Sequence, residues 1–236
     1  MLNQKTREIL GALGAINQSQ IISYPRTVIK LGKSIQAFLD VDSTADNGCQ
    51  EEEFEEFGVY VINELNSVVN VIDNPEITNN NGILTIKNET SSVQYGTTPL
   101  DIIESESRGN PAVIDNVMNP ERNTKVLSFD LSSKELDKIK KMSGLLKNLT
   151  DLKINTKDND ITLTVTSKEK SSNNFSITTE GETIEDITML LLMDSVNKLP
   201  SSDYKVQIFK SSKGSLVAVF ESIDVDGLRI LVSSKA

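Results

Sequence analysis

The sequence predicts an α+β protein of two similar domains, in which helices pack against antiparallel sheets. One order of elements, helix, strands, helix and strands, occurs twice along the 236 residues. A segment of turn residues with little periodicity separates the two halves. The composition, with 37% hydrophobic and 25% charged residues, is that of an ordinary globular protein. We therefore expect domains at 1–104 and 125–236, joined by an exposed connector at 105–124.

The first half opens with a predicted helix over residues 3–17. Its apolar residues recur at helical spacing: Ile9, Leu10, Leu13 and Ile16. A short helix is expected at 63–72, after an acidic loop at 46–56. Alternating side chains bounded by turn residues predict strands at 21–29, 34–42, 57–62, 82–88 and 92–95.

The second half repeats this order. Ser132 is the expected N-cap of a helix that runs to about residue 147. The apolar stripe of this helix consists of Leu136, Ile139, Met142 and Leu146. A short helix at 194–199 is stopped by Pro200 and follows an apolar segment at 189–193. Strands are expected at 126–131, 152–155, 161–167, 175–179, 204–210, 215–221 and 228–233.

The residue types argue against catalysis. Histidine and tryptophan are absent, which excludes histidine-based triads and histidine-bound zinc. Cys49 is the single cysteine, and its acidic neighbours favour an inert thiol. The carboxylates of residues 51–56 have the contiguous spacing of a solvated charge run, not of a metal site. No glycine-rich phosphate loop is present, so we expect no enzyme activity, no metal and no cofactor.

The sequence also predicts a cytoplasmic protein. Lys5 and Arg7 give the chain a positive start, but polar residues and glycines interrupt the segment that follows. No apolar run has the length of a signal peptide core or of a membrane span. We expect no membrane partner.

Basic charge is concentrated in one predicted helix. The chain has a formal net charge of −10, but residues 134–147 hold five lysines against two acidic residues. The lysines are Lys134, Lys138, Lys140, Lys141 and Lys147. This segment therefore carries +3 and the rest of the chain −13. Helical geometry turns one face, with Lys134, Lys140, Lys141 and Lys147, away from the apolar stripe, which indicates either a solvated face or a surface for phosphates.

The other helices give weaker indications of the same kind. The non-core face of the first helix contains Arg7 and several small or amide side chains, with Lys5 on its flank. In the helix at 63–72, Asn63, Asn66, Ser67 and Asn70 share one face and offer groups that could touch phosphates. Lys198 ends the corresponding helix of the second half and is a further candidate.

Three stretches carry a family resemblance: TREILGALGAIN at 6–17, FDLSSKELDKIKKMSGLL at 129–146 and MDSVNKLPSSDYKVQIF at 193–209. In their order and spacing across two similar halves, the chain resembles the DNA sliding clamps, or polymerase processivity factors, of T-even-type bacteriophages. The acidic segment at 46–56 is longer than in those relatives.

The resemblance implies a homotrimeric ring of six domains, with helices lining the interior and antiparallel sheets outside. Such a clamp encircles double-stranded DNA without reading its sequence and tethers the replicative DNA polymerase. Its partners would be a clamp loader ATPase, the polymerase and, as a further candidate, the transcription machinery, in the cytoplasm of an infected bacterium. An apolar pocket near the connector would receive partner tails. Candidate strands for the subunit junctions are 174–179 and 96–103.

Two other classes of protein remain open at this point. A non-enzymatic phage structural protein that forms oligomeric rings would use the repeat and the edge strands equally well. A metal-dependent enzyme using carboxylates would need acidic residues that converge from separate strands. The lysine cluster favours the clamp over the first, and the lack of histidine disfavours the second.

Overall fold

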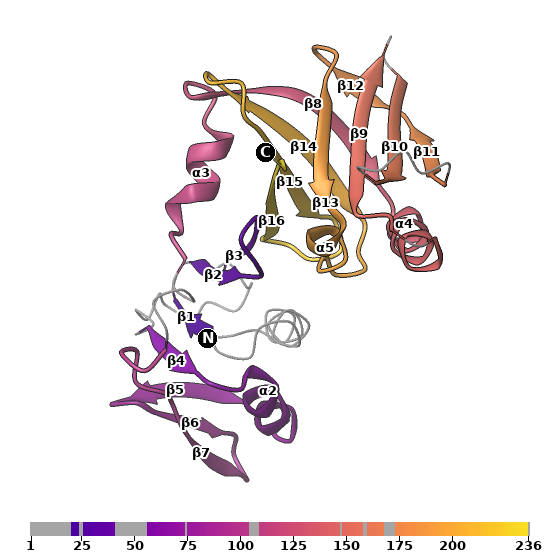
Figure 1. Ribbon diagram of the computed structural model, residues 1–236. Helices are drawn as coiled ribbons and strands as arrows, with labels where there is room; N and C mark the ends of the chain where they lie inside the picture. Colours follow the sequence, from indigo (N-terminus) through magenta and orange to yellow (C-terminus); the bar gives the residue numbers. More distant parts are fainter. Residues whose placement is uncertain are drawn as a thin grey trace. The chain divides into compact units, whose positions relative to one another are not determined.

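The computed structural model describes residues 20–23, 26–40, 56–73, 75–103, 109–146, 148–157, 160–167 and 173–235 (Figure 1). The predicted helix at 3–17 and most of the acidic loop lie outside this part. The chain forms two compact units. The first comprises Met1–Lys30 with Ala37–Pro111, and the second Leu31–Gln36 with Ala112–Ala236.

The first unit contains short antiparallel strands and one described helix. β1 (Gln20–Ile22) pairs with β4 (Phe57–Val59), and a separate sheet has the order β5-β6-β7. The strands of that sheet are β5 (Glu76–Asn80), β6 (Ile83–Lys87) and β7 (Ser92–Gly96). Helix α2 (Ile62–Asn70) follows β4 and buries Ile62, Leu65 and Val69, the one stripe that helical periodicity brings together.

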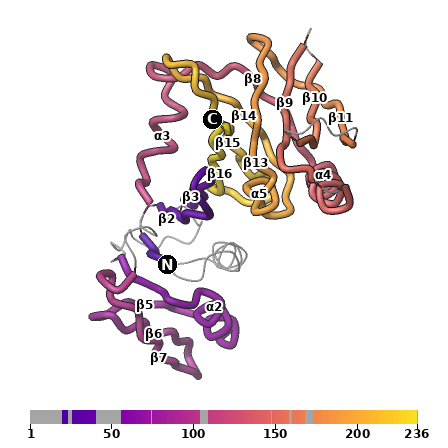
Figure 2. Tube along the Cα trace, viewed as in Figure 1, coloured from indigo at the N-terminus to yellow at the C-terminus, as the bar shows by residue number. Residues whose placement is uncertain are grey.

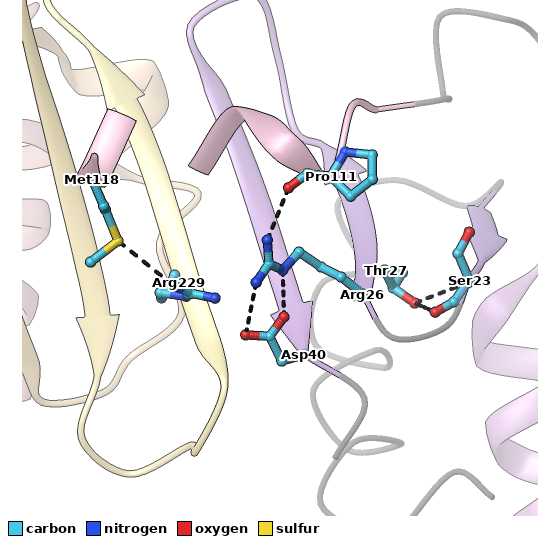
Figure 3. Close-up of polar contacts among 7 residues, drawn as sticks. All are labelled: Ser23, Arg26, Thr27, Asp40, Pro111, Met118 and Arg229. Carbon is cyan, nitrogen blue, oxygen red and sulfur yellow. Dashed lines mark hydrogen bonds and ion pairs between the residues drawn. The ribbon is translucent and has the colours of Figure 1, made fainter. Parts of the chain in front are cut away.

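Polar contacts join the remaining strands of this unit, β2 (Arg26–Lys30) and the end of β3 (Ile35–Asp40). The Arg26 guanidinium forms an ion pair with Asp40 and donates a hydrogen bond to the Pro111 carbonyl oxygen at 3.0 Å (Figure 3). The Thr27 hydroxyl donates to the Ser23 carbonyl oxygen at 3.2 Å. Arg26 is therefore engaged in internal contacts.

The second unit contains two antiparallel sheets. The larger includes the strand order β12-β8-β14-β15-β16, and the smaller has the order β11-β10-β9-β13. The first set consists of β12 (Gly181–Thr183), β8 (Asn123–Leu131), β14 (Tyr204–Ser211), β15 (Leu216–Ser222) and β16 (Leu228–Ser233). The second set consists of β11 (Phe175–Thr179), β10 (Asp160–Thr166), β9 (Asp151–Lys157) and β13 (Thr188–Leu192).

Two helices of this unit pack on the smaller sheet. α4 (Ser133–Leu145) contacts β10 and β11, and α5 (Met193–Val196) contacts β13 and β9, as the trace in Figure 2 shows. α4 and α5 also contact each other. α5 is one turn long, shorter than the predicted helix at 194–199, and Ser195 and Val196 are buried in it. The smaller sheet therefore supports both helices.

Local sequence explains why α4 begins where it does. The Ser132 hydroxyl accepts a hydrogen bond from the Glu135 backbone amide, and the Glu135 carboxylate accepts one from the Ser132 amide at 2.9 Å. This reciprocal capping box satisfies two amides that lack partners inside the helix. The predicted N-cap at Ser132 is confirmed.

Part of the segment expected to be an exposed connector is helical. It contains helix α3 (Ala112–Met118), in which Ile114 is buried. The Arg229 side chain lies 3.7 Å from the Met118 sulfur, in contact with the end of α3 (Figure 3). The expectation of an irregular segment over all of 105–124 was wrong for these seven residues, because one buried apolar side chain is enough to dock a short helix.

Strands β5 and β12 were not predicted, and β13 was expected only as an apolar segment at 189–193. β5 has the polar sequence EITNN, and β12 consists of only three residues. Both gain their hydrogen bonds from a neighbouring strand, β6 and β8 respectively.

Among the helices of the described residues, none has the length and apolar character needed to cross a membrane.

Candidate nucleic-acid interface

The exposed side of α4 carries three of the five predicted lysines. Lys134, Lys138 and Lys141 are all exposed, whereas Leu136 and Ile139 on the opposite side are fully buried. Leu145 lies on the lysine side and is 64% exposed. Asp137 is the acidic residue on this side, so the described exposed face has a net charge of +2. The helix therefore presents ammonium groups to solvent from a rigid, core-packed support.

Lys140 does not belong to this exposed face. It follows Leu136 by four residues, which places it only about 40° away around the helix, on the flank of the core side. Its ammonium group donates a hydrogen bond to the Leu199 carbonyl oxygen, and the side chain is half-buried. Desolvation lowers the pKa of Lys140, and Asp137 partly opposes that effect. The expectation that Lys140 lies on the open lysine face was wrong.

The apolar stripe of α4 is also narrower than predicted. Met142 and Leu146 are half-buried, so only Leu136 and Ile139 are fully enclosed. The first turns of α4 are consequently held more firmly than its end.

Lys198 lies just after α5 and is engaged at the surface. Its ammonium group forms an ion pair with Asp194 at 3.0 Å, and the side chain is 27% exposed. An exposed pair of this kind contributes little to stability, so the lysine can exchange its partner at small cost.

The neutral face of α2 is present as predicted, with one difference. Asn63, Ser67 and Asn70 are exposed, and Asn66 is half-buried. The Ser67 hydroxyl donates to the Asn63 carbonyl oxygen one turn earlier, at 2.8 Å. This face offers amide groups but no cation.

Three predicted DNA-binding residues, Lys5, Arg7 and Lys147, lie outside the described residues. Their assignment stays a prediction.

Several described strands lie at the edge of a sheet, β11 and β7 among them. β11 is an outer strand of the smaller sheet in the second unit, and it matches the predicted junction segment at 174–179. The other predicted segment, 96–103, is not a strand. Thr98 forms only an isolated bridge with Gly58, and Pro99 then starts a turn in which Ile102 donates to its carbonyl. Among the described residues, β5 and β7 are the edge strands of the three-stranded sheet, and β7 ends at Gly96, where the predicted segment begins.

Hollows occur in the described part of each unit. One, of about 240 Å³, belongs to the first unit and is lined by residues that include Ser23, Arg26 and Glu56. The other, of about 350 Å³, lies in the second unit between α3 and the β14–β15 turn. Its lining includes Val113, Val117 and Lys213. The second has the mixed apolar and basic lining that a peptide segment could use.

No cluster of three or more cysteine or acidic residues able to hold a metal ion occurs among the described residues. Glu56 is the part of the acidic run that the structure describes, and it accepts a hydrogen bond from the Ser23 hydroxyl at 3.2 Å.

Comparison with solved structures identifies the fold. A crystal structure of proliferating cellular nuclear antigen from Entamoeba histolytica matches 98% of this chain and 94% of its own chain, with a TM-score of 0.66 and 15% sequence identity. No protein-family model and no curated protein matches the sequence. The likeness confirms the predicted α+β DNA-clamp fold with antiparallel sheets. At this identity it shows the fold alone.

Helical periodicity does not predict contacts between separate elements. The capping box and the lysine run could be read from neighbouring residues. The contact between Lys140 and Leu199 joins residues 59 positions apart, and no sequence signal marks it.

Proposed function

We propose that this protein is a sliding clamp that encircles double-stranded DNA and tethers a DNA polymerase, without enzymatic activity of its own. The observation that carries the proposal is the exposed basic face of α4 on a clamp fold, in a chain whose formal net charge is −10. Attraction for phosphates needs a basic surface, and α4 is where the described structure concentrates one.

The chemistry of this face suits sliding. Lys134, Lys138 and Lys141 are flexible point charges that attract phosphates without fixing a register. None of them is an arginine or aromatic side chain of the kind that reads or stacks on bases. DNA would therefore be held by long-range attraction and by closure of the ring, and it would remain free to move. The acidic remainder of the chain would repel DNA from other surfaces.

Other candidate contacts would add to α4. The amides of α2 would touch phosphates directly or through water, and Lys198 would join by releasing Asp194. Lys5, Arg7 and Lys147 complete the proposed set. Lys140 would contribute positive charge but not a direct phosphate contact, because its ammonium group is bound to Leu199.

We propose a homotrimer in which two domains from each of three chains close the ring. The open edges of β11 and β7 would pair between neighbouring subunits, since unpaired strand edges are templates for association. This pairing would cover the edges of β11 and β7 in the closed ring.

The hollow beside α3 is the proposed docking site for partner tails. Val113 and Val117 would receive apolar side chains, and Lys213 would attract an acidic flank. The proposed users are the polymerase, the clamp loader ATPase and, in a phage setting, the transcription machinery. They would compete for one site.

Two measurements test the proposal: the mass of the assembly in solution and the processivity of a polymerase. Light scattering of purified protein at micromolar concentration is expected to give a trimer. Primer extension with a replicative polymerase and its loader, with and without the protein, is expected to give longer products in its presence. A trimer without any effect on product length would favour a ring-forming structural protein, and a monomer would contradict the assembly.

A further inference from the structure

The basic helix α4 is held at three points by one short loop, residues 199–203, between α5 and β14. The Asp203 carboxylate accepts a hydrogen bond from the Ser133 backbone amide at 2.6 Å. The Ser201 hydroxyl donates to the Asp137 carboxylate at 3.0 Å. The Leu199 carbonyl oxygen accepts from the Lys140 ammonium group. These contacts are spread over the first two turns of the helix, the part nearest its cap.

The loop is itself fixed from the core side. The buried Tyr204 donates its hydroxyl to the Pro200 carbonyl oxygen at 2.9 Å, and its ring meets the Phe220 ring edge-on at 5.9 Å. Burial, with a smaller effect of Asp224, raises the pKa of Tyr204, so the hydroxyl remains a donor. The core of the larger sheet therefore sets the position of Pro200.

A second set of contacts ties the other end of the loop to the turn after β15. The Asp224 carboxylate accepts from the Ser202 hydroxyl and from the Asp203 amide, each at 2.8 Å. The Ile223 amide donates to the Asp203 carbonyl oxygen at 2.8 Å. Ser202 and Ser222 exchange a buried hydrogen bond at 2.8 Å. A loop with this many partners transmits the position of the sheet to the helix.

We infer that the loop 199–203 is a positioning element for the DNA-facing lysines of α4, with Asp203 as its main positioning residue and Lys140 as part of the anchor. This inference rests on the proposed function. Asp203 would act through Lys134, Lys138 and Lys141, which it does not need to touch. It holds the first turn of α4, and thereby the direction in which the exposed lysines project.

The charge on Asp203 makes the inference testable. If charge alone mattered, loss of an acidic group beside a basic helix would strengthen binding to DNA. If Asp203 positions the helix, its loss weakens binding although the surface becomes more positive. Hydrogen bonds from Ser133 lower the pKa of Asp203, and the bond from its backbone amide has a larger effect than the one from its side chain. The positive charge of Lys134 lowers this pKa further. This agrees with a carboxylate whose charged form is in use.

The experiment compares Asp203→Ala, Asp203→Asn and the matched control Asp226→Ala. Asp226 is an exposed acidic residue in the turn between β15 and β16. The readout is retention on a nicked circular duplex after loading, measured against salt concentration. Asp203→Ala is expected to shorten the retention time several-fold. Asp203→Asn keeps an oxygen acceptor for the Ser133 amide and should restore the wild-type retention time. Asp226→Ala should leave the retention time equal or longer. Equal or longer retention for Asp203→Ala would overturn the inference.

A second measurement separates this inference from the proposed function. Amide hydrogen exchange of the first turn of α4 should be faster in Asp203→Ala than in Asp203→Asn or Asp226→Ala, whether or not the protein binds DNA. Unchanged exchange in Asp203→Ala would contradict the anchor. If exchange responds but the wild-type protein is not retained on DNA, the anchor stands and the proposed function fails.

Lysine footprinting tests the place of Lys140. An amine-acetylating reagent is applied to the loaded and the free protein, and the ratio of the two rates is taken for each lysine, which cancels intrinsic differences in reactivity. We expect DNA to protect Lys134, Lys138 and Lys141 several-fold and to leave the ratio for Lys140 near unity. Protection of Lys140 equal to that of Lys141 would show that it contacts DNA and would remove it from the anchor.

Discussion

Helices α4 and α2 have similar buried sides but different exposed ones. Each encloses an apolar stripe, with Leu136 and Ile139 in α4 and with Leu65 and Val69 in α2. α4 begins with a capping box and exposes lysines, whereas α2 follows Val61, which provides no side-chain cap, and exposes amides, a hydroxyl and the Glu64 carboxylate. The packing of a helix therefore does not determine what its outer face offers to a ligand.

The different exposed side chains suggest that α4 and α2 contribute in different ways to DNA binding in the proposed clamp. Lysines attract phosphates over a distance and release counterions on contact, so their contribution depends on salt. Neutral amides act only at contact and release no counterions. If both helices face DNA, α4 supplies most of the attraction and α2 supplies a polar surface along which the duplex can move.

The largest expected effect follows from removing the lysines of α4. Lys134, Lys138 and Lys141 changed together to Ala should shorten retention on DNA by at least about tenfold at low salt, and the gap should narrow as salt is added, since each lost phosphate contact lowers the salt slope by about 0.9. Adding Lys147→Ala should deepen the defect. The melting temperature should stay within about 3 °C of wild type, because exposed lysines contribute little to stability.

A matched control uses exposed lysines from other elements. Lys87, Lys157 and Lys205 changed together to Ala remove the same charge from β6, β9 and β14. Retention on DNA should change far less than in the α4 variant. Equal losses in the two variants would mean that total charge matters and that α4 is not the binding face.

The buried stripes should respond alike in both helices. Leu136→Ala and Leu65→Ala each remove a side chain that is at most 2% exposed and should lower the free energy of unfolding by about 2–5 kcal/mol. Leu145→Ala, on the exposed side of α4, should cost no more than about 0.5 kcal/mol. Chemical denaturation of the three variants measures this. A cost for Leu145 equal to that for Leu136 would indicate that the exposed side is covered.

Variants at the N-cap positions of the two helices should differ in the free energy of unfolding, by less than variants in the buried stripes change it. Ser132→Ala removes the hydroxyl that accepts from Glu135 and should cost about 1 kcal/mol. α2 has no such side-chain cap at Val61, so Val61→Ala should show only the loss of a half-buried apolar side chain. Denaturant titrations of both variants, compared at one pH, provide the measurement. No loss in Ser132→Ala would mean that Asp203 alone is sufficient to hold the first turn.

The sequence predicted features that depend on neighbouring residues. The N-cap at Ser132, the strand Phe175–Thr179 and the strand Leu228–Ser233 are present as expected. Each has a local signal, a cap spacing or an alternation of side chains between turn residues. The overall clamp fold was reached through resemblance, and the structural likeness confirms it.

Features that depend on distant partners were not predicted. β5 has little apolar character and forms because β6 provides hydrogen bonds along its length. α3 is a short helix beside residues typical of turns, and burial of Ile114 stabilises it. Lys140 was assigned to the wrong side because its partner, the Leu199 carbonyl, comes from a loop that periodicity does not describe. The site required tertiary contacts that sequence spacing does not contain.

Acid should weaken the anchor of α4. The pKa of Asp203 lies below its usual value in the folded protein, so the unfolded chain binds the proton more readily. The contribution of this carboxylate is therefore complete above the usual value of 3.8 and is lost as the pH falls through the lowered pKa. The difference in unfolding free energy between wild type and Asp203→Asn should shrink in that range. An Asp226→Asn control reports general charge effects, and a difference that grows in acid would contradict the assignment.

The smallest expected effect concerns the amides of α2. Asn63, Ser67 and Asn70 changed together to Ala remove polar groups without changing the charge of the protein. Because neutral groups release no counterions, the salt slope of DNA retention should remain that of wild type, and retention itself should change by less than about threefold. Single-molecule diffusion on stretched DNA, read at two salt concentrations, separates the slope from the absolute rate. A change of slope as large as that of the α4 variant would show that α2 organises the phosphate contacts, and the two helices would then share the work that we assign to α4.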